Sequence, residues 1–298
     1  MTNQIKLTDN DAVSLMETAD GVKIFAPDLA YRKFSMVNVI FYGDPSVGPD
    51  DANSWVLIDT GLPTSAAGIV ESAEQRFGRG TRPAAIIMTH AHFDHAGSVE
   101  TLARDWDVPV YAHPMEMPYL SGQASYPPAD PMAGGGLLAL LSPLYPRSPV
   151  DVGHRLKMLP ADRSVPFMPG WTWIATPGHS PGHVSLFRES DRTLIAGDAI
   201  VTTGQESIYE VMMQTLEMHG PPRYLTPDWM EAEQSVQALA ALQPDLIITG
   251  HGRPVKGAGA RAALDRLAAD FRSIAVPEGG HYDRKPAMPG KSDSDAYR

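Results

Sequence analysis

The chain has 298 residues, enough for one large domain or two small ones, and its 43% hydrophobic and 20% charged residues predict a globular protein rather than a disordered one. The formal net charge of −11 argues against nucleic acid as the main partner, because binding to a phosphate backbone requires a basic surface. Because the chain contains no cysteine, it cannot form disulfides, use a cysteine nucleophile or bind a metal through thiolates, so any metal must be held by histidine, aspartate or glutamate.

The first eleven residues are polar and lack the apolar stretch that a signal peptide requires. Apolar runs elsewhere in the sequence are far too short to span a bilayer. We therefore expect a cytoplasmic protein without a membrane partner.

Short segments rich in valine, isoleucine, phenylalanine and tryptophan predict β-strands along most of the chain. In chain order, the expected strands are 13–16, 35–42, 55–59, 84–89, 108–112, 156–159, 172–176, 183–187, 193–196 and 246–249. Apolar positions with helical spacing predict helices over 64–77, 97–106, 228–242 and 258–273. Strands and helices are interleaved and strands are more numerous, a pattern typical of layered sheets flanked by helices.

Three stretches fit neither pattern. Residues 115–151 combine many prolines and a run of three glycines with numerous methionines and leucines, and residues 202–227 are rich in methionine and tyrosine. Long connections of this kind in a compact domain are usually functional, so we expect both to be lid-like insertions in a catalytic domain over 1–276. The apolar side chains of the first insertion either form a substrate pocket or pack on the domain surface or against a homodimer partner. The polar residues 277–298 predict a flexible C-terminal tail.

A dense group of metal-ligating residue types follows the apolar strand expected at 84–89. His90, His92, Asp94 and His95 lie within six residues. Side chains two apart in an extended segment point the same way, so His90 and His92 can share one ion, while Asp94 and His95 can face a second ion as the chain turns toward a helix. Three imidazoles and one carboxylate suit zinc, manganese or ferrous iron.

Later candidates also stand at the ends of expected strands, where loops commonly carry active-site groups. They are Asp59, His179, Asp198 and His251. A single aspartate in such a place is usually a cap or a turn residue, but together with the first group these residues predict one site. His183, four residues after His179, is expected to be structural. Four tyrosines are candidate oxyanion donors that nothing in the sequence ranks: Tyr119, Tyr145, Tyr209 and Tyr224.

In their order along the chain, these residues resemble the five sequence motifs of the metallo-β-lactamase superfamily. The motifs are Asp59, the His-x-His-x-Asp-His run at 90–95, His179, Asp198 and His251. The resemblance implies an α+β fold, the four-layer αββα sandwich. It is specific for the fold and for the metal site, and it does not specify the substrate.

The resemblance also implies a role for each residue. It implies that one metal is held by His90, His92 and His179, and a second by Asp94, His95 and His251, with Asp198 bridging both. Asp59 would orient a ligand imidazole, and Asp94 or Asp198 would move a proton. Two zinc ions, or iron or manganese in their place, would lower the pKa of a shared water to about 7, and the hydroxide would attack an ester, a thioester or a lactone.

Several activities of this superfamily stay open, each with a small-molecule substrate. The run from His92 to Gly97 is similar to that of acyl-homoserine lactonases, but Val201 stands where those enzymes usually carry a tyrosine. The C-terminal segment is shorter than the helical, basic domain of hydroxyacylglutathione hydrolases. A phosphodiesterase or a β-lactamase-type hydrolase is an alternative, as is an oxidoreductase resembling the iron-dependent persulfide dioxygenases. The complete ligand set argues against a metal-binding module without turnover.

Overall fold

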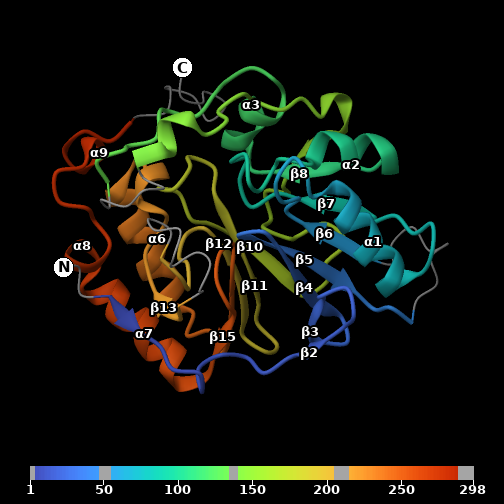
Figure 1. Cartoon of the computed structure of the whole chain (residues 1–298), viewed down its shortest axis with the longest axis horizontal. Coiled ribbons are helices and arrows are strands. Elements are labelled where there is room, and N and C mark those ends of the chain that lie inside the picture. The colour runs from blue at the N-terminus through green and yellow to red at the C-terminus, as the bar shows by residue number, and fades with distance from the viewer. Residues whose placement is uncertain (1–3, 47–54, 134–139, 205–214, 288–298) are drawn as a thin grey trace.

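Two β-sheets lie face to face in the middle of the molecule, and helices cover the outer face of each sheet (Figure 1). The computed structural model describes residues 4–46, 55–133, 140–204 and 215–287. These layers form the αββα sandwich that the sequence predicts. In the described parts of the chain, no helix combines the length and the hydropathy that a membrane span requires.

The larger sheet has eight strands in sequence order, β2 to β9. Neighbours from β2 to β6 run antiparallel, and those from β6 to β9 run parallel. The strands are β2 (Met16–Glu17), β3 (Lys23–Ala26), β4 (Leu29–Phe34), β5 (Val37–Gly43), β6 (Trp55–Ile58), β7 (Ala85–Ile87), β8 (Val110–Ala112) and β9 (Leu156–Met158). The parallel half requires crossover connections, and α1 (Ala66–Phe77) and α2 (Val99–Trp106) supply two of them.

The second sheet has five strands in the order β10-β11-β12-β14-β15, of which only β12 and β14 pair in parallel. They are β10 (Trp171–Ala175), β11 (Val184–Arg188), β12 (Thr193–Gly197), β14 (Leu246–Thr249) and β15 (Val255–Lys256). The outer face is covered by α6 (Trp229–Ala241) and α7 (Gly257–Ala269) (Figure 1). A separate two-stranded ribbon pairs β1 (Ile5–Lys6) with β13 (Glu217–Met218).

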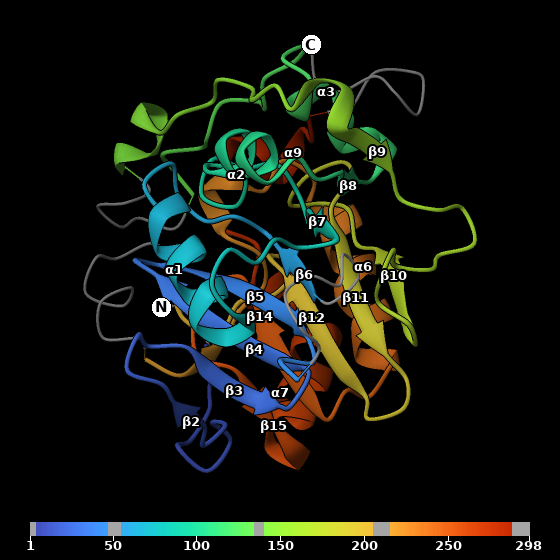
Figure 2. The same ribbon diagram turned by 90° about the vertical axis from the view of Figure 1, so that its right-hand side faces the viewer.

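Further single-turn helices in the described parts of the chain are α3 (Met117–Leu120), α8 (Phe271–Ile274), α9 (His281–Arg284) and the 3-10 turns η1 (Pro114–Glu116), η2 (Ser142–Leu144), η3 (Gly153–Arg155) and η4 (Arg223–Leu225). Figure 2 turns α1 and α2 toward the viewer and shows both lying over the larger sheet.

Alternation along the buried strands builds three apolar layers, because successive side chains of a strand point to opposite faces. On β5, Val39 and Phe41 face α1 and α2, whereas Ile40 faces the other sheet. On β14, Ile247 packs toward α6 and α7, and Ile248 joins the layer between the sheets. Each sheet is therefore covered on both faces by packed apolar side chains.

The structure differs from the sequence prediction at the N-terminal edge. The strand expected at 13–16 is reduced to Met16, which pairs within β2, and the hairpin β3–β4 was not predicted. Charged residues interrupt the apolar pattern of β4. Arg32 pairs within the sheet, but its side chain extends to α1 and donates hydrogen bonds to Ser72 Oγ (2.8 Å) and Gly68 O (3.2 Å). The helix predicted over 258–273 is also divided, at Asp270, into α7 and α8.

The segment expected to form a flexible tail packs on the domain as far as residue 287. Tyr282 is buried, and its hydroxyl donates a hydrogen bond to Pro128 O at 2.7 Å. The backbone N–H of Ala287 donates to Pro227 O at 3.0 Å. Residues 128 and 227 belong to the two long insertions, so the C-terminal segment contacts both of them. Residues 134–139, 205–214 and 288–298, including Tyr209, lie outside the described residues.

One buried amide joins the two sheets. Asn38, on the inner face of β5, is 2% exposed and donates from Nδ2 to Thr249 O (2.9 Å) and Gly252 O (2.8 Å). Its backbone N–H donates to Gly250 O at 2.8 Å. The turn that follows β14 is thus held against the larger sheet.

We expect Asn38→Ala to lower the free energy of unfolding by about 1–3 kcal/mol, because two buried carbonyl groups lose their donor. Asn38→Asp should cost more, since a carboxylate would face two carbonyl oxygens. Asn10→Ala, at an exposed asparagine, is the matched control and should stay within about 0.5 kcal/mol of the wild type. Denaturant unfolding measures all three; equal stability of Asn38→Ala and Asn10→Ala would contradict the structural role of Asn38.

Candidate metal centre

The predicted site residues meet at the edge of the two sheets where several strands end. Asp59 directly follows β6, Asp198 directly follows β12, and His251 lies two residues beyond β14. The run from His90 to His95 follows β7, and His179 stands in the loop between β10 and β11. The structure therefore brings together all seven side chains expected to bind metal, and all seven are buried.

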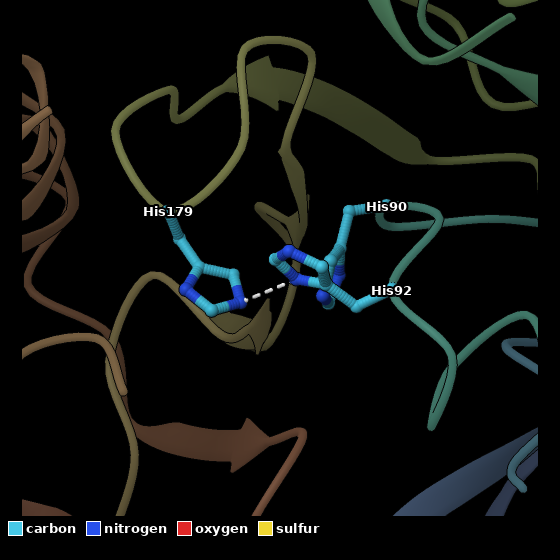
Figure 3. A group of neighbouring side chains, drawn as sticks. All are labelled: His90, His92 and His179. Atoms are coloured by element: carbon cyan, nitrogen blue, oxygen red, sulfur yellow. Dashed lines mark hydrogen bonds between the residues drawn. The ribbon is translucent and has the colours of Figure 1, made fainter. Parts of the chain in front are cut away.

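Three histidines form the first group. Ligand nitrogens of His90, His92 and His179 all lie within 4.8 Å of one another. Figure 3 shows the three rings turned toward one another, with His92 Nδ1 and His179 Nε2 at 2.9 Å. His90 and His92 come from the turn after β7, and His179 approaches from the other sheet.

Asp94, His95 and His251 form a second group, also within 4.8 Å of one another. His251 Nε2 lies 3.3 Å from Asp94 Oδ2. Asp198 lies between the groups: Oδ2 is 3.6 Å from His179 Nε2 and 3.1 Å from His251 Nε2, and Oδ1 is 3.4 Å from His95 Nε2. The single carboxylate of Asp198 therefore reaches both groups.

Four of the five histidines in the two groups are oriented by a hydrogen bond on the side of the ring that faces away from the site. Nδ1 contacts an acceptor in each: Asp59 Oδ2 for His95 (2.8 Å), Met36 O for His251 (2.8 Å), Thr89 Oγ1 for His90 (3.0 Å) and Thr226 Oγ1 for His179 (3.3 Å). With Nδ1–H donating outward, Nε2 of each ring points inward. Histidines that bind metals are commonly oriented in this way by a second hydrogen bond.

Asp59 holds its place through the segment that carries the histidines. It accepts from the backbone N–H of Thr89 (2.8 Å) and from the Thr89 hydroxyl (2.7 Å), and it also contacts His95. Asp59 adopts a positive φ of 60°, a conformation that aspartate tolerates better than most residues. Its position agrees with the orienting role that the sequence predicts.

Three inner atoms of the site make no hydrogen bond within the described residues, although two of them, His95 Nε2 and Asp198 Oδ1, lie 3.4 Å apart. His90 Nε2, His95 Nε2 and Asp198 Oδ1 are buried without a hydrogen bond. Such groups are rare in folded proteins, because an unpaired buried polar atom is costly. Gly250 leaves the space that this arrangement needs, since a Cβ there would overlap Asp198 Oδ1 and stand 2.7 Å from His95 Cε1. Imidazole and carboxylate lone pairs that face one another in a buried space fit a bound divalent cation.

The two groups differ in their protonation without a metal. Burial, aided by the neighbouring imidazoles, holds the pKa of His90 and His179 well below the ordinary value and lowers the pKa of His92 to about 4. Burial also opposes the charged form of His95 and His251, but Asp198 and the other nearby carboxylates outweigh it. They raise the pKa of His95 well above its usual range and that of His251 to about 10.

His183 lies beside the site and outside both groups, in agreement with its predicted structural role. Its Nε2 accepts from the backbone N–H of Asp198 at 2.9 Å, and its Nδ1 contacts Thr176 Oγ1 at 2.8 Å. Burial lowers the pKa of His183 to about 3. A Cβ at Gly197 would stand 2.6 Å from His183 Nε2, so the glycine allows the ring to reach the backbone of Asp198.

Aromatic side chains lie next to Asp94. The ring of Tyr145 packs 5.4 Å from Phe93 and 5.9 Å from Tyr224, and burial together with the charge of Asp94 raises the pKa of Tyr145. Tyr119 instead stacks on Tyr126 at 3.8 Å, and His219 pairs with Glu217 at 3.3 Å. Sequence patterns did not indicate Glu116, Tyr126 or Thr226, although Glu116 had one signal: it is a carboxylate just beyond the strand at 108–112.

Comparison with known proteins agrees with this geometry. Residues 33–251 match the family model described as the metallo-beta-lactamase superfamily. A probable metallo-hydrolase of Bacillus subtilis, YflN, is 51% identical over 226 residues, which cover 76% of this chain and 86% of YflN. A hydroxyacylglutathione hydrolase of Erwinia tasmaniensis is 29% identical, covering 54% of this chain and 48% of that protein. The crystal structure of a beta-lactamase domain protein from Burkholderia ambifaria has the same fold, with a TM-score of 0.59, 21% identity, and coverage of 88% and 80%.

The protonation difference predicts two pH dependences for metal affinity. His95 and His251 must lose a proton to bind a metal, so the affinity of their group should rise with pH from 6 to 9. The three-histidine group is already neutral, and its affinity should fall only when the pH approaches the pKa of His92, about 4. Zinc titrations against a competing chelator at several pH values measure how the affinity for each ion changes with pH. The same pH dependence for both ions would contradict the assignment of the two ligand groups.

We expect Gly250→Ala to reduce the bound metal, because the added methyl group occupies space beside Asp198 and His95. Gly80→Ala is the control: its φ is +74°, so alanine costs about 1–2 kcal/mol there, but no atom lies within 4 Å. Metal analysis after gel filtration, with a thermal melt of each variant, separates loss of metal from loss of stability. Full metal content in Gly250→Ala would show that the space has no role in binding.

Proposed function

Because the chain belongs to the metallo-beta-lactamase superfamily, we propose that it binds two zinc ions and hydrolyses an ester, a thioester or a lactone. That it is a metallo-hydrolase follows from the match over residues 33–251 and from the likeness to YflN. The number and identity of the ions, and the class of substrate, are the proposal.

One observation carries the proposal of two ions: two buried ligand groups share a single carboxylate. His90, His92 and His179 form one group, and Asp94, His95 and His251 form the other, with Asp198 within 3.6 Å of both. A site for one ion needs only one of these groups. Histidine and carboxylate ligands in this number suit zinc, which binds both without redox chemistry.

Two bound zinc ions would supply a shared hydroxide at neutral pH and would polarise the substrate carbonyl group. Asp198, through its two oxygens, holds the groups in a fixed relation. Asp94 is poised to take a proton from the attacking water and to return it to the leaving group, because hydrogen bonding to His251 lowers its pKa against the effect of burial and keeps it ionised. Asp59 keeps Nδ1 of His95 protonated, so that Nε2 faces the centre.

The surroundings of Asp94 support a small apolar or aromatic acyl group in the substrate. Phe93, Tyr145 and Tyr224 form a row of aromatic rings there, and aromatic side chains contribute large apolar contact areas. The net charge of −11 also favours a small molecule over nucleic acid. A thioester is favoured by the likeness to the Erwinia tasmaniensis hydroxyacylglutathione hydrolase.

Exhaustive chelation should abolish hydrolysis of a panel of esters, thioesters and lactones, and two equivalents of zinc should restore it, because the chain offers no cysteine nucleophile to replace the metal-activated water. Asp198→Asn should lower kcat/KM by more than about 100-fold even with zinc in excess, since it disturbs both groups. The rate of product formation measures turnover.

Hydrolysis that survives metal removal would overturn the proposal. Oxygen consumption with a persulfide by the iron-loaded protein, in the absence of hydrolysis, would favour the dioxygenase instead.

A further inference from the structure

Glu116 is a fully buried carboxylate near the metal centre that the proposed chemistry does not use. It ends η1 just beyond β8, and its relative exposure is 0%. A buried ionised carboxylate is costly unless it is fully hydrogen-bonded. Its contacts therefore indicate what it holds together.

Four donors surround the two oxygens of Glu116. Oε1 accepts from the Ser180 hydroxyl (2.7 Å) and from the backbone N–H of Gly182 (2.8 Å). Oε2 accepts from the backbone N–H of Ala91 (3.0 Å) and from the Tyr126 hydroxyl. Burial raises the pKa of Glu116, but all four hydrogen bonds favour its charged form.

Three of these donors, Ala91, Ser180 and Gly182, belong to the two loops that carry the three histidines. Ala91 stands between His90 and His92, so its peptide N–H helps to fix the backbone from which both side chains leave. Ser180 directly follows His179. One carboxylate therefore joins a loop of the larger sheet to a loop of the smaller sheet at the point where the first ligand group is assembled.

The surrounding structure is built closely around this carboxylate. A Cβ at Gly182 would stand 2.8 Å from the backbone nitrogen of Glu116 and 2.9 Å from its Cγ, so only glycine allows the loop to come so near. Tyr126 extends the connection, because its hydroxyl also accepts from Ala91 N–H (3.0 Å) and its ring lies 4.2 Å from that of His92.

The second ligand group is held by other residues. His95 bonds to Asp59, and His251 bonds to the backbone carbonyl of Met36. Among the described residues, the hydrogen bonds of Glu116 reach Ala91, Tyr126, Ser180 and Gly182, and none of them involves Asp59 or Met36. Asp59 thus contacts a ligand of the second group directly and reaches the three-histidine group only through Thr89, whereas Glu116 bonds to the loops of the three-histidine group.

We propose that Glu116 is the positioning residue of the three-histidine group and sets the affinity for the ion bound there, without setting the affinity of the second group. The inference rests on the proposed function, since it assumes that both groups bind metal. Glutamine cannot replace the glutamate, because each oxygen accepts two hydrogen bonds and an amide nitrogen would face two donors in either orientation.

Zinc titration of Glu116→Gln against a competing chelator tests this, with the wild type titrated alongside. One of the two ions should bind about 10- to 100-fold more weakly, and the other should keep its wild-type affinity. Cadmium NMR identifies the weakened site, because a site with three nitrogen ligands and a mixed nitrogen–oxygen site resonate separately. Asp59→Asn is the matched variant and should weaken the other ion.

The results separate this inference from the proposed function. A wild type that binds no metal contradicts the proposed function, whereas two ions bound with wild-type affinity by a folded Glu116→Gln contradict only the role of Glu116. Equal weakening of both ions with a lowered melting temperature also overturns it, because that is the result of a general structural role. If Glu116→Gln does not fold, Ser180→Ala, which removes one of four donors, should weaken the same ion several-fold; no change there counts against the inference.

Discussion

The structure depends on a buried group of imidazole nitrogens and carboxylate oxygens that face one another. His92 Nδ1 and His179 Nε2 face each other at 2.9 Å, and His90 Nε2, His95 Nε2 and Asp198 Oδ1 are buried without a hydrogen bond from any described residue. An unpaired buried polar atom is costly, so a buried arrangement of this kind favours protonation of His95 and His251 or the binding of a metal cation between the groups. Binding of metal is therefore coupled to the stability of the strand ends that carry them.

The rest of the fold keeps this arrangement in place. Two sheets, each covered on both faces, bring the ends of β6, β7, β12 and β14 to one edge, and the loop after β10 closes the site from the same side. Polar residues between the sheets then join segments far apart in sequence: Asn38 holds the turn that carries His251, Asp59 holds His95, and Glu116 spans two histidine loops. A rigid set of ligands is what lets a metal site activate water at neutral pH.

The resemblance to the superfamily motifs was sufficient to predict the fold class and to name the seven ligand candidates that the structure brings together, whereas the strand and helix pattern alone predicted only layered sheets flanked by helices. Neither was sufficient for Glu116, whose partners Ala91, Ser180 and Gly182 lie 25 to 66 residues away, since no local pattern reports such contacts. The hairpin β3–β4 does not follow from the sequence pattern, because Arg32 and Lys33 interrupt the apolar residues of β4. In the structure, the Arg32 side chain reaches α1 and the Lys33 side chain is exposed. The packing of Tyr282 was missed because polar composition alone predicts a tail.

The most direct test of this account is the position of the metal ions. Anomalous diffraction at the zinc absorption edge, from crystals of the zinc-loaded protein, locates zinc independently of any assay. The account predicts two peaks about 3.5–4 Å apart, one among His90, His92 and His179 and one among Asp94, His95 and His251, with Asp198 beside both. A single peak, or zinc bound elsewhere while these residues stay free, would contradict it.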